Sequence, residues 1–450
     1  MYDVFCISAG QLIVKKDANN INKKNNYLNY GLLSLASIIK MSGLSPIQLH
    51  GNFIEPREFA NYCISMGIVN TKYPVFISIP SFYAISWVNI FTKILKKELK
   101  IKEVIVGGRW VIDGEINQLA QMLPYVDKVI DGLGENKLSG LLGRKIEKII
   151  GYVPLNYRLL DKREMYQPSI EVSRGCGMKC TFCQERNEKL QPLKSPINIA
   201  SEVSDILLKD ELHPMSAYFE ASMFKPTSDW LEELIEQREI HSHTYFWRAE
   251  SRVDTFPVKQ IPSLVNAGMK VLDLGLESAS PTQIKLMGKS NTPAKYLHRA
   301  SNLIEKAHSA GIDVKVNILL YAGESNKTID ETYKWLDEHR AYIKGVSVGP
   351  VLAFGWDNKK SDFIKSLRLL GATIHDDKSL KGVTSLNLSS SIDYNTSLRI
   401  SKDLSREFMT AKDYFYLKSF SYFSRDYTYE QFLQDIKIEK GSYSFDISNI

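Results

Sequence analysis

The sequence predicts an α/β protein with two parallel-sheet domains in series and a carboxyl-terminal extension. Three observations carry this prediction. Short apolar segments alternate with amphipathic segments over the first 140 residues, the alternation resumes after a break near residue 150, and the chain ends in an aromatic-rich segment. Alternating strands and helices are typical of parallel sheets, because the crossover from one parallel strand to the next usually contains a helix.

The first predicted domain, residues 1–145, is an open Rossmann-like sheet with a helix over residues 30–41. Its predicted strands are residues 2–8, 46–50, 75–79, 104–106 and 126–130. The last two strands are followed by four glycines, Gly107, Gly108, Gly132 and Gly134. Ligands of open parallel sheets bind at the carboxyl ends of the strands, where glycine lets the backbone approach them. These glycines therefore mark a candidate ligand edge, although ordinary tight turns would also explain them.

The second predicted domain, residues 167–353, is a partial barrel of six β/α units, and residues 146–166 form a linker before it. The linker region has no apolar period and contains Pro154. The predicted strands of the barrel are residues 169–173, 215–219, 244–248, 271–276, 313–320 and 346–351. Its predicted helices include residues 197–209, 228–238, 261–267 and 292–310. A (β/α)6 barrel of the TIM type has its active site at the carboxyl ends of the strands.

The carboxyl-terminal extension, residues 354–450, is predicted to be mainly helical. Its aromatic residues include Phe408, Tyr414, Phe415, Tyr416, Phe420, Tyr422, Phe423, Tyr427, Tyr429 and Phe432. Such a run is typical of helices that pack against a larger body. A lid that faces the substrate is the alternative.

Composition places the chain among ordinary globular proteins. Its 450 residues are 44% hydrophobic and 24% charged, and 57 Lys and Arg against 51 Asp and Glu leave a net charge of +6. This surplus is too small to predict a nucleic-acid partner. No apolar run approaches the ~18 residues of a membrane helix, and residues 1–10 lack the features of a signal peptide. We therefore expect a cytoplasmic protein with no membrane partner.

Three of the five cysteines, Cys176, Cys180 and Cys183, lie within eight residues directly after the first strand of the barrel. In a reducing compartment such a group predicts a metal site. Three thiolates suit a four-iron cluster with one iron left open to a small molecule. Zinc is the alternative, but it would normally have a fourth ligand nearby, and the next histidine is His213. The remaining cysteines are predicted to be isolated core residues, Cys6 and Cys63.

The spacing Cys176-x3-Cys180-x2-Cys183, with Phe182 before the last cysteine, resembles the signature of radical S-adenosylmethionine (SAM) enzymes. The resemblance implies a [4Fe-4S] cluster on the three cysteines, whose open iron is chelated by SAM, with Phe182 as a cofactor-binding residue beside it. The reduced cluster would cleave SAM and yield a 5′-deoxyadenosyl radical that abstracts hydrogen from the substrate. It also implies an electron donor such as flavodoxin or ferredoxin.

Later segments resemble the SAM-binding strands of this family, in the same order along the chain. The contacts that the resemblance implies are Glu220 with the SAM amino group, Arg252 with the carboxylate, and Glu277 or Ser278 with the ribose hydroxyls. Residues 317–324 resemble the adenine segment, but Leu320 and Ala322 stand where glycine and proline are usual. The adenine contacts there do not carry over.

The first domain resembles the cobalamin-binding domain that precedes the barrel in one large radical SAM subgroup. The matching segments are residues 30–36, 77–81, 104–108 and 131–135. The residues that would lie against cobalamin are Gly107, Gly108, Gly132 and Gly134. The DxHxxG motif that supplies an axial histidine to cobalt is absent from the first 150 residues. Cobalamin would therefore bind without a histidine ligand, or the domain would be an empty scaffold.

The cysteine count excludes several branches of this family. Beyond the motif, only Cys6 and Cys63 remain. Auxiliary clusters need several further cysteines, and methylthiotransferases need three more ahead of the motif. RNA methylation through a methyl-carrying cysteine near the carboxyl end is excluded as well, since no cysteine follows Cys183.

Two functions stay open, both on a small metabolite or a natural-product intermediate. One is cobalamin-dependent methyl transfer, which would make the protein a transferase. The other is a cobalamin-independent radical dehydration, epimerisation or rearrangement with a vestigial first domain. A non-catalytic iron–sulfur or zinc protein is the third reading. Corrinoid bound after anaerobic purification would separate the first two, and a cluster that does not bind SAM would support the third.

Overall fold

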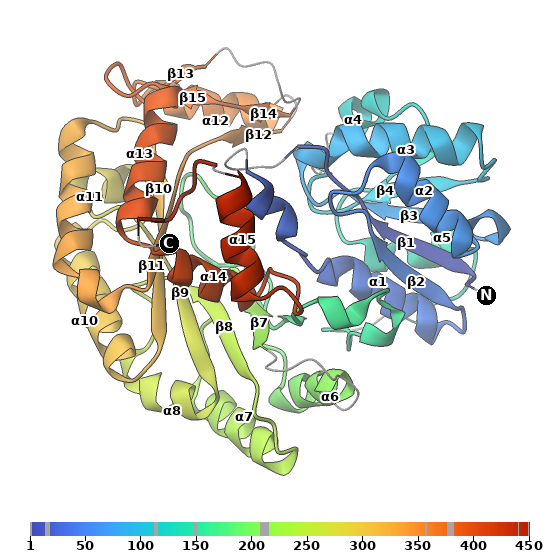
Figure 1. Ribbon diagram of the computed structural model, residues 1–450, viewed down its shortest axis with the longest axis horizontal. Coiled ribbons are helices and arrows are strands. Elements are labelled where there is room, and N and C mark those ends of the chain that lie inside the picture. The colour runs from blue at the N-terminus through green and yellow to red at the C-terminus, as the bar shows by residue number, and fades with distance from the viewer. Residues whose placement is uncertain are drawn as a thin grey trace. The chain divides into compact units, whose positions relative to one another are not determined.

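The computed structural model divides into two compact units, each with one large parallel sheet (Figure 1). It describes residues 2–13, 19–111, 116–147, 151–207, 216–355, 358–375, 382–439, 441–448 and 450. The first unit is residues 1–166 with the short segments 355–357 and 380–382, and the rest of the chain forms the second. The second unit therefore contains both the barrel strands and most of the carboxyl-terminal extension.

The first unit has a five-stranded parallel sheet in the order β2-β1-β3-β4-β5. Its strands are β1 (Val4–Ser8), β2 (Pro46–His50), β3 (Val75–Ser78), β4 (Val104–Gly107) and β5 (Lys128–Val129). Every residue of β1 and β2 is buried, as expected for strands covered on both faces. The predicted doubly wound class is confirmed, but the order is that of flavodoxin-like sheets, whose topological switch lies between β1 and β3.

Four α-helices of the described residues lie between these strands, and a fifth follows β5. They are α1 (Tyr30–Met41), α2 (Pro56–Ser65), α3 (Ile85–Lys97), α4 (Ile116–Met122) and α5 (Leu138–Leu142). Figure 1 shows α1 and α3 on opposite faces of the sheet. The side chain of Asn29 caps α1 by accepting the backbone N–H of Leu32 at 3.1 Å, and Gly43 follows its end with a φ of 86°. The predicted helix over residues 30–41 is confirmed at both ends.

The second unit has a six-stranded parallel sheet in sequential order from β6 to β11. Its strands are β6 (Ser169–Glu171), β7 (Ser216–Glu220), β8 (Phe246–Ser251), β9 (Met269–Glu277), β10 (Asp313–Leu320) and β11 (Gly345–Pro350). All six predicted strands are present, and β10 has the predicted bounds. Met215 and Lys209, predicted to begin the second strand and to end the helix before it, lie outside the described residues.

Side chains alternate along β10 between two environments. Val314, Val316 and Ile318 are buried, whereas Lys315 and Asn317 between them are only half-buried and belong to the opposite face. The short helix α9 (Pro281–Leu286) follows β9, and the helices of the outer layer are α6 (Pro196–Leu207), α7 (Ser228–Ile240), α8 (Ile261–Asn266), α10 (Pro293–Ser309) and α11 (Asn326–Glu338) (Figure 1). The sheet therefore buries apolar residues under these helices and turns polar residues toward the inside of the barrel.

The described part of the extension is mainly helical. Its elements are α12 (Asn358–Arg368), α13 (Tyr394–Glu407), α14 (Ala411–Ser419), α15 (Tyr429–Glu439), and the short strand pairs β12 (Ala353–Phe354) with β14 (Val383–Thr384) and β13 (Thr373–Ile374) with β15 (Leu386–Asn387). Helix α13 covers the edge strand β11, where Ser405 Oγ accepts the backbone N–H of Val348 at 3.1 Å. In α14, Tyr416 donates to Asp313, the first residue of β10, at 2.8 Å. Helix α14 therefore packs at the amino ends of the strands, which agrees with the packing prediction and not with a lid over the carboxyl ends.

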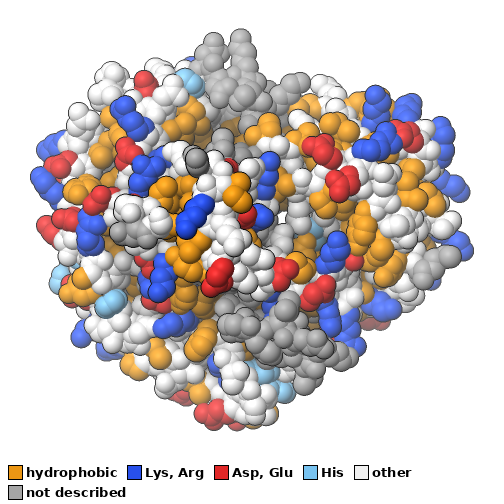
Figure 2. All heavy atoms as spheres, viewed as in Figure 1, with side chains coloured by type: hydrophobic (Ala, Val, Ile, Leu, Met, Phe, Trp, Pro, Cys, Tyr) orange, Lys and Arg blue, Asp and Glu red, His pale blue; other side chains and the backbone are white. Residues whose placement is uncertain are grey.

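Two surface properties bear on partners. In the part of the chain that the structure describes, no helix is both long enough and apolar enough to span a membrane. On the face drawn in Figure 2, Lys and Arg side chains are interspersed with Asp and Glu. This mixture on that face differs from the basic stripe that binds nucleic-acid phosphates.

Candidate metal centre

The three clustered cysteines lie on the loop that follows β6, at the carboxyl edge of the barrel sheet. Gly175, directly before Cys176, has a φ of 69°, and a Cβ there would lie 2.2 Å from the backbone oxygen of Lys189. Glycine is required because any side chain would push the returning chain away. The backbone N–H of Gly177 donates to Glu188 O at 2.9 Å and ties the loop to the same returning chain.

The three thiols differ in exposure and in hydrogen bonding. Cys180 is buried, whereas Cys176 and Cys183 are half-buried. The Sγ of Cys180 accepts a hydrogen bond from Arg252 Nη1 at 2.9 Å, and the Sγ of Cys183 accepts the backbone N–H of Glu185 at 3.4 Å. Burial raises the pKa of Cys176 and of Cys183, and a backbone N–H donated to each sulfur opposes the rise. Hydrogen bonds to the cysteine sulfurs are one means by which proteins set the reduction potential of iron–sulfur clusters.

Three thiols on one loop match the ligand set of a four-iron cluster with one open iron. The thiol of Cys183 is within electrostatic range of both Cys176 and Cys180. Yet among the described residues no three Cys, His, Asp or Glu side chains are close enough to share one metal ion. Zinc draws four ligands to within about 2.0–2.3 Å of one atom, whereas in a cluster each cysteine binds a different iron. His213, the next histidine along the chain, lies outside the described residues.

Contacts with the barrel hold the cysteine loop on both sides. The backbone N–H of Thr181 donates to Met287 O at 3.0 Å, and the Thr181 hydroxyl lies 3.1 Å from the hydroxyl of Tyr321. After the loop, Lys194 forms a fully buried ion pair with Glu202 of α6 at 2.7 Å. Breaking such a pair would leave an unpaired charge in the interior, which is costly. The ion pair therefore fixes the position of the chain that returns from the loop.

Charged side chains line the inner face of the barrel sheet. They are Glu171 in β6, Glu220 in β7, Arg248 and Glu250 in β8, Asp273 and Glu277 in β9, and Lys315 in β10. The strand register places Glu171 beside Glu220, and Asp273 beside both Glu250 and Lys315. Among the ion pairs of the described residues, Glu171, Asp273 and Glu277 have cationic partners, whereas Glu220 and Glu250 have none. Among the described residues, the inner face therefore carries two carboxyls without an ion-pair partner within 4 Å, although the charge of Arg248 acts on both.

Glu220, predicted to contact the SAM amino group, is the last residue of β7. Burial raises its pKa to about 7, a hydrogen bond with Ser169 opposes the rise, and the charge of Glu250 adds to it. Burial and then the charge of Asp273 likewise raise the pKa of Glu250 to about 7. A cation beside these carboxyls would favour their charged forms and lower both pKa values. The contact of Glu220 with SAM stays a prediction.

Arg252, predicted to contact the SAM carboxylate, faces the cysteine loop and has other partners. Its Nε and Nη2 donate to the carboxylate of Asp254 at 3.0 and 3.1 Å, and Nη2 also donates to Lys289 O at 2.8 Å. With the bond to Cys180, these contacts use four of the five guanidinium N–H groups. The predicted SAM contact is untested, and one N–H remains for it.

The two predicted ribose residues lie in different surroundings. Glu277 has a φ of 67°, rare for a residue other than glycine, at a register shift between β9 and β10. This turn brings its Oε1 to 3.4 Å from Lys289 Nζ. Ser278 is buried, and its hydroxyl lies 3.1 Å from that of Thr332 in α11. Both ribose contacts stay predictions, and Ser278 already has a partner inside the fold.

Sequence reasoning missed Lys289, which lies next to several predicted site residues. Lys289 is buried, donates to Gly275 O at 2.9 Å, and its Nζ is 6.0 Å from the centre of the Phe182 ring. Phe182, predicted to lie near SAM, also makes an edge contact with Tyr321 at 6.2 Å between ring centres. A lysine in a loop is usually solvated, so no pattern in the sequence marks this one.

The four predicted glycines of the first unit have different structural roles. At Gly108, with a φ of 112°, a Cβ would lie 2.9 Å from the backbone of Ile79, so the packing of β3 against β4 requires this glycine. At Gly107 and Gly134 a Cβ would meet neighbours at 3.4 and 3.1 Å. At Gly132, with a φ of 62°, a Cβ would meet no atom of the described residues within 4 Å. Gly132 alone of the four borders open space, and a cobalamin contact of any of them stays a prediction.

Buried polar atoms without partners also lie at the strand ends of the first unit. Ser81 follows β3 and is 2% exposed, yet its hydroxyl has no partner among the described groups. His50, the last residue of β2, accepts the backbone N–H of Asn29 on Nε2 at 3.1 Å and leaves Nδ1 without a partner. Burial lowers the pKa of His50 to about 3. Unsatisfied buried groups of this kind fit a polar ligand at this edge.

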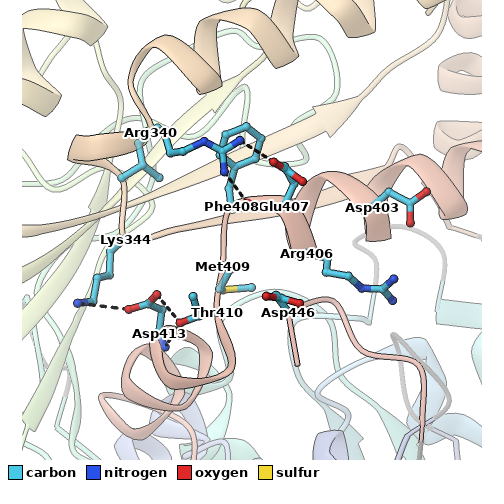
Figure 3. A pocket seen from close by; sticks show the side chains of 11 residues that line it. Arg340, Lys344, Asp403, Arg406, Glu407, Phe408, Met409, Thr410, Asp413 and Asp446 are labelled. Carbon is cyan, nitrogen blue, oxygen red and sulfur yellow. Dashed lines mark hydrogen bonds and ion pairs between the residues drawn. The ribbon is translucent and has the colours of Figure 1, made fainter. Parts of the chain in front are cut away.

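A separate hollow of about 630 Å³ lies around the end of α13 and the residues before β11 (Figure 3). Ion pairs within its lining include Lys344–Asp413 at 3.3 Å and Arg340–Glu407 at 2.6 Å. Because Lys344 precedes β11, this hollow lies at the amino ends of the strands. The cysteine loop lies at the opposite edge, so the hollow is not part of the candidate metal centre.

Residues 170–336, which include the cysteine loop, match the Radical SAM superfamily. The chain is also 25% identical over 242 residues to a tRNA-2-methylthio-N(6)-dimethylallyladenosine synthase of Campylobacter jejuni subsp. doylei, and 26% identical over 247 residues to the protein of that name from Campylobacter jejuni subsp. jejuni. Each match covers 50% of this chain and 54% of the relative. The chain thus spans about half the length of the curated relatives that it matches. The superfamily consists of enzymes and implies a [4Fe-4S] cluster and SAM.

Two solved structures share the fold. One is the radical SAM methyltransferase TsrM from Kitasatospora setae with tryptophan substrate and a SAM analogue, at a TM-score of 0.59 and 14% identity over 77% of this chain and 73% of that one. The other is the cobalamin-dependent SAM radical enzyme OxsB with aqua-cobalamin and SAM, also at 0.59 and 14%, over 81% of this chain and 55% of that one. At this identity the likeness concerns the fold alone.

Proposed function

We propose that this chain, whose residues 170–336 are a radical SAM domain, cleaves SAM reductively and uses the resulting radical on a small-metabolite or natural-product substrate. The observation that carries the proposal is the loop of three thiols, Cys176, Cys180 and Cys183, at the carboxyl edge of the barrel sheet in the segment that matches the superfamily. When bound, the cluster supplies one electron to SAM, which splits into methionine and a 5′-deoxyadenosyl radical. A donor such as flavodoxin or ferredoxin would provide that electron.

The residues of the chain itself would bind and orient SAM. Cys176, Cys180 and Cys183 would hold the cluster, and Glu220 would face the ammonium group of SAM. The inner face of the barrel supports this role, because Glu220 and Glu250 lack cationic partners among the described residues while SAM carries an ammonium and a sulfonium. Walls of the barrel would keep water from the reacting atoms.

SAM should bind more tightly as the pH rises through about 7. In the free chain burial raises the pKa of Glu220 to about 7, so the carboxyl is partly protonated at neutral pH. An ammonium beside it favours the charged form, so binding lowers this pKa and releases a proton. Affinity is then lost as the pH falls through about 7. Anaerobic calorimetry from about pH 6 to about pH 8, in buffers that differ in ionisation enthalpy, measures both the Kd and the proton release.

The variant Glu220→Gln tests whether the carboxyl of Glu220 causes this pH dependence of SAM binding. The variant keeps the size of the side chain, and above about pH 7 it should weaken SAM binding by at least about tenfold and remove most of the pH dependence. Glu239→Gln, an exposed change at the end of α7, is the matched control and should bind like the original chain. Unchanged affinity and proton release in Glu220→Gln would rule out its contact with the ammonium.

Cobalamin-dependent methyl transfer is the reaction that we propose, with cobalamin at the strand ends of the first unit. The flavodoxin-like strand order supports this, because ligands of such sheets bind at the switch between β1 and β3. The open space at Gly132 and the unpartnered hydroxyl of Ser81 support it as well. The DxHxxG motif that would supply an axial histidine is absent from the first 150 residues, so we expect no histidine on cobalt.

Gly132→Asn should weaken corrinoid binding by at least about tenfold without unfolding the first unit. Asn tolerates the left-handed backbone of this position, and its side chain would enter the open space where we place the ligand. Gly143→Asn is the matched control, since Gly143 has nearly the same φ, 61°, and equally free space at the end of α5. Corrinoid absorbance per chain after anaerobic purification gives the result.

Equal corrinoid uptake by the two asparagine variants would exclude this edge as the binding site. If the original chain takes up no corrinoid, the proposal of methyl transfer is rejected in favour of a cobalamin-independent dehydration, epimerisation or rearrangement. An electron paramagnetic resonance spectrum of the Co(II) form with a nitrogen ligand would contradict the expected absence of a histidine.

The names of the curated relatives point to tRNA modification, which differs from the expectation of no nucleic-acid partner. Methylthio transfer needs three further cysteines according to the family resemblance. Cys6 in β1 and Cys63 in α2 are fully buried, as predicted for core residues, and burial raises the pKa of each to about 12. Two inert core thiols do not meet that need, so we propose a small-molecule substrate.

The proposed reaction has a direct test. Anaerobically reconstituted protein with SAM and a chemical reductant should form 5′-deoxyadenosine, and the assay with and without added cobalamin compares the two candidate reactions. A protein that binds the cluster and SAM but forms no 5′-deoxyadenosine or methylated product would remove the enzymatic proposal.

A further inference from the structure

We propose that Arg252 is a positioning residue for the cluster, which holds the Cys180 sulfur and makes the cluster easier to reduce. The inference rests on the proposed function in one respect, since it needs a cluster on the three cysteines. It differs from the SAM carboxylate contact that the family resemblance implies for the same residue.

The guanidinium of Arg252 is fixed before any ligand binds. Asp254 accepts its Nε and Nη2 at 3.0 and 3.1 Å, as a planar fork meets a carboxylate, and Lys289 O accepts Nη2 at 2.8 Å. Arg252 is 6% exposed, so water competes little for these bonds. The remaining nitrogen, Nη1, is thereby aimed at the Sγ of Cys180, 2.9 Å away.

The backbone carbonyl of Lys289, which accepts a hydrogen bond from Arg252 Nη2, is fixed as well. Lys289 donates its backbone N–H to Ile284 O at 3.0 Å and its Nζ to Gly275 O at 2.9 Å. The carbonyl that receives Arg252 is therefore anchored to α9 and to β9. Cys180 is the most buried of the three thiols, and it alone of them accepts a charged donor in the described structure. The three cluster ligands are therefore unequal, and the positive charge lies on the side of Cys180.

The hydrogen bond from Arg252 Nη1 to Cys180, on a guanidinium whose Nε and Nη2 are paired with Asp254, changes the reduction of the cluster. Reduction adds one negative charge to the iron–sulfur core, and a hydrogen-bonded guanidinium stabilises the reduced form more than the oxidised form. The effect is large in the interior, where screening is weak. Because Asp254 already occupies the fork, Arg252 could take the SAM carboxylate by its fork only by giving up that partner.

A redox titration in the absence of SAM separates the two roles. Reconstituted full-length protein is poised at a series of potentials, and electron paramagnetic resonance measures the reduced cluster. In Arg252→Gln the ratio of reduced to oxidised cluster at a fixed potential should fall at least tenfold, a shift of 59 mV for one electron, to more negative potential. Arg252→Lys keeps the charge and should show a smaller shift.

Arg299→Gln is the matched control. It removes the same charge from an exposed side chain whose Nη1 lies 3.4 Å from the backbone oxygen of Asp254 and which makes no contact with the cysteines among the described hydrogen bonds. Its midpoint potential should equal that of the original chain. Loss of iron from Arg252→Gln alone, with the melting temperature of the apo-protein unchanged, would also support the proposal, because Cys180 would have lost its anchor.

An unchanged midpoint potential in Arg252→Gln with four irons per chain would overturn the proposal. If SAM affinity then falls instead, Arg252 is the carboxylate contact that the resemblance implies. An original chain that binds no four-iron cluster would overturn the proposed function itself, so the two failures are distinguishable.

Discussion

Cys176→Ala, Cys180→Ala and Cys183→Ala should each leave the chain without a stable cluster and without SAM cleavage. Three thiolates are the smallest set that holds four irons with one open site, and two would leave a second iron without a protein ligand. Iron should fall from about four atoms per chain to a small fraction of that number. Iron analysis after anaerobic reconstitution and chromatography of 5′-deoxyadenosine measure the two losses.

Cys6→Ala and Cys63→Ala are the controls. Both side chains are fully buried in the first unit, in β1 and α2, whereas the three motif thiols belong to the second unit. Each variant should keep about four irons and lose only the packing of one sulfur atom. Loss of iron from either control, or about eight irons in the original chain, would contradict a single three-cysteine cluster.

The strands and the metal loop could be predicted because local patterns determine them. Strand β10, Asp313–Leu320, alternates polar and apolar residues and is flanked by turns, so its bounds follow from the sequence. The cysteine loop is a short motif whose ligands lie within one segment. Ligands that lie within a few positions of one another can be recognised from their spacing in the sequence.

The partners of the site residues could not be predicted, because they come from distant segments. Arg252 meets Cys180 across 72 positions of the chain, and Lys289 follows a helix that the sequence does not mark as part of a site. Glu277 reaches Lys289 through a left-handed backbone that its residue type disfavours. Such contacts depend on strand register and loop packing, which the pattern of one segment does not contain.

The strand order of the first unit shows the same limit. Alternating strands and helices predict a doubly wound sheet, but flavodoxin-like and Rossmann sheets share that alternation. The order depends on where the chain reverses its direction of winding, here between β1 and β3. Likewise, the aromatic residues of the extension predict packing without naming the surface that receives them. In the structure one such surface surrounds Arg248.

Arg248→Ala should destabilise the second unit by about 3–5 kcal/mol. Arg248 is 2% exposed, and its Nε donates to Asp273 at 2.8 Å while Nη1 donates to Leu417 O of α14 at 2.7 Å. Burial alone would raise the pKa of Asp273, but the charges of Arg248 and Lys315 outweigh it and lower the pKa. Removal of the guanidinium leaves the buried carboxylate of Asp273 without its arginine partner and the carbonyl of Leu417 without its donor.

Urea denaturation of the apo-protein, followed by a probe in the barrel, measures this loss. Lys270→Ala is the control, since its Nζ lies 3.9 Å from Asp313 at a partly exposed position and the pair should contribute less than about 1 kcal/mol.

The double variant Arg248→Met with Asp273→Leu should recover much of the stability, because apolar side chains of similar size replace both charges. Hydrogen exchange of α14 should rise in Arg248→Ala and in the double variant alike, since both lose the bond to Leu417 O. An Arg248→Ala variant as stable as the control would mean that Asp273 is satisfied by Lys315 alone, and that the extension does not depend on the barrel through this arginine.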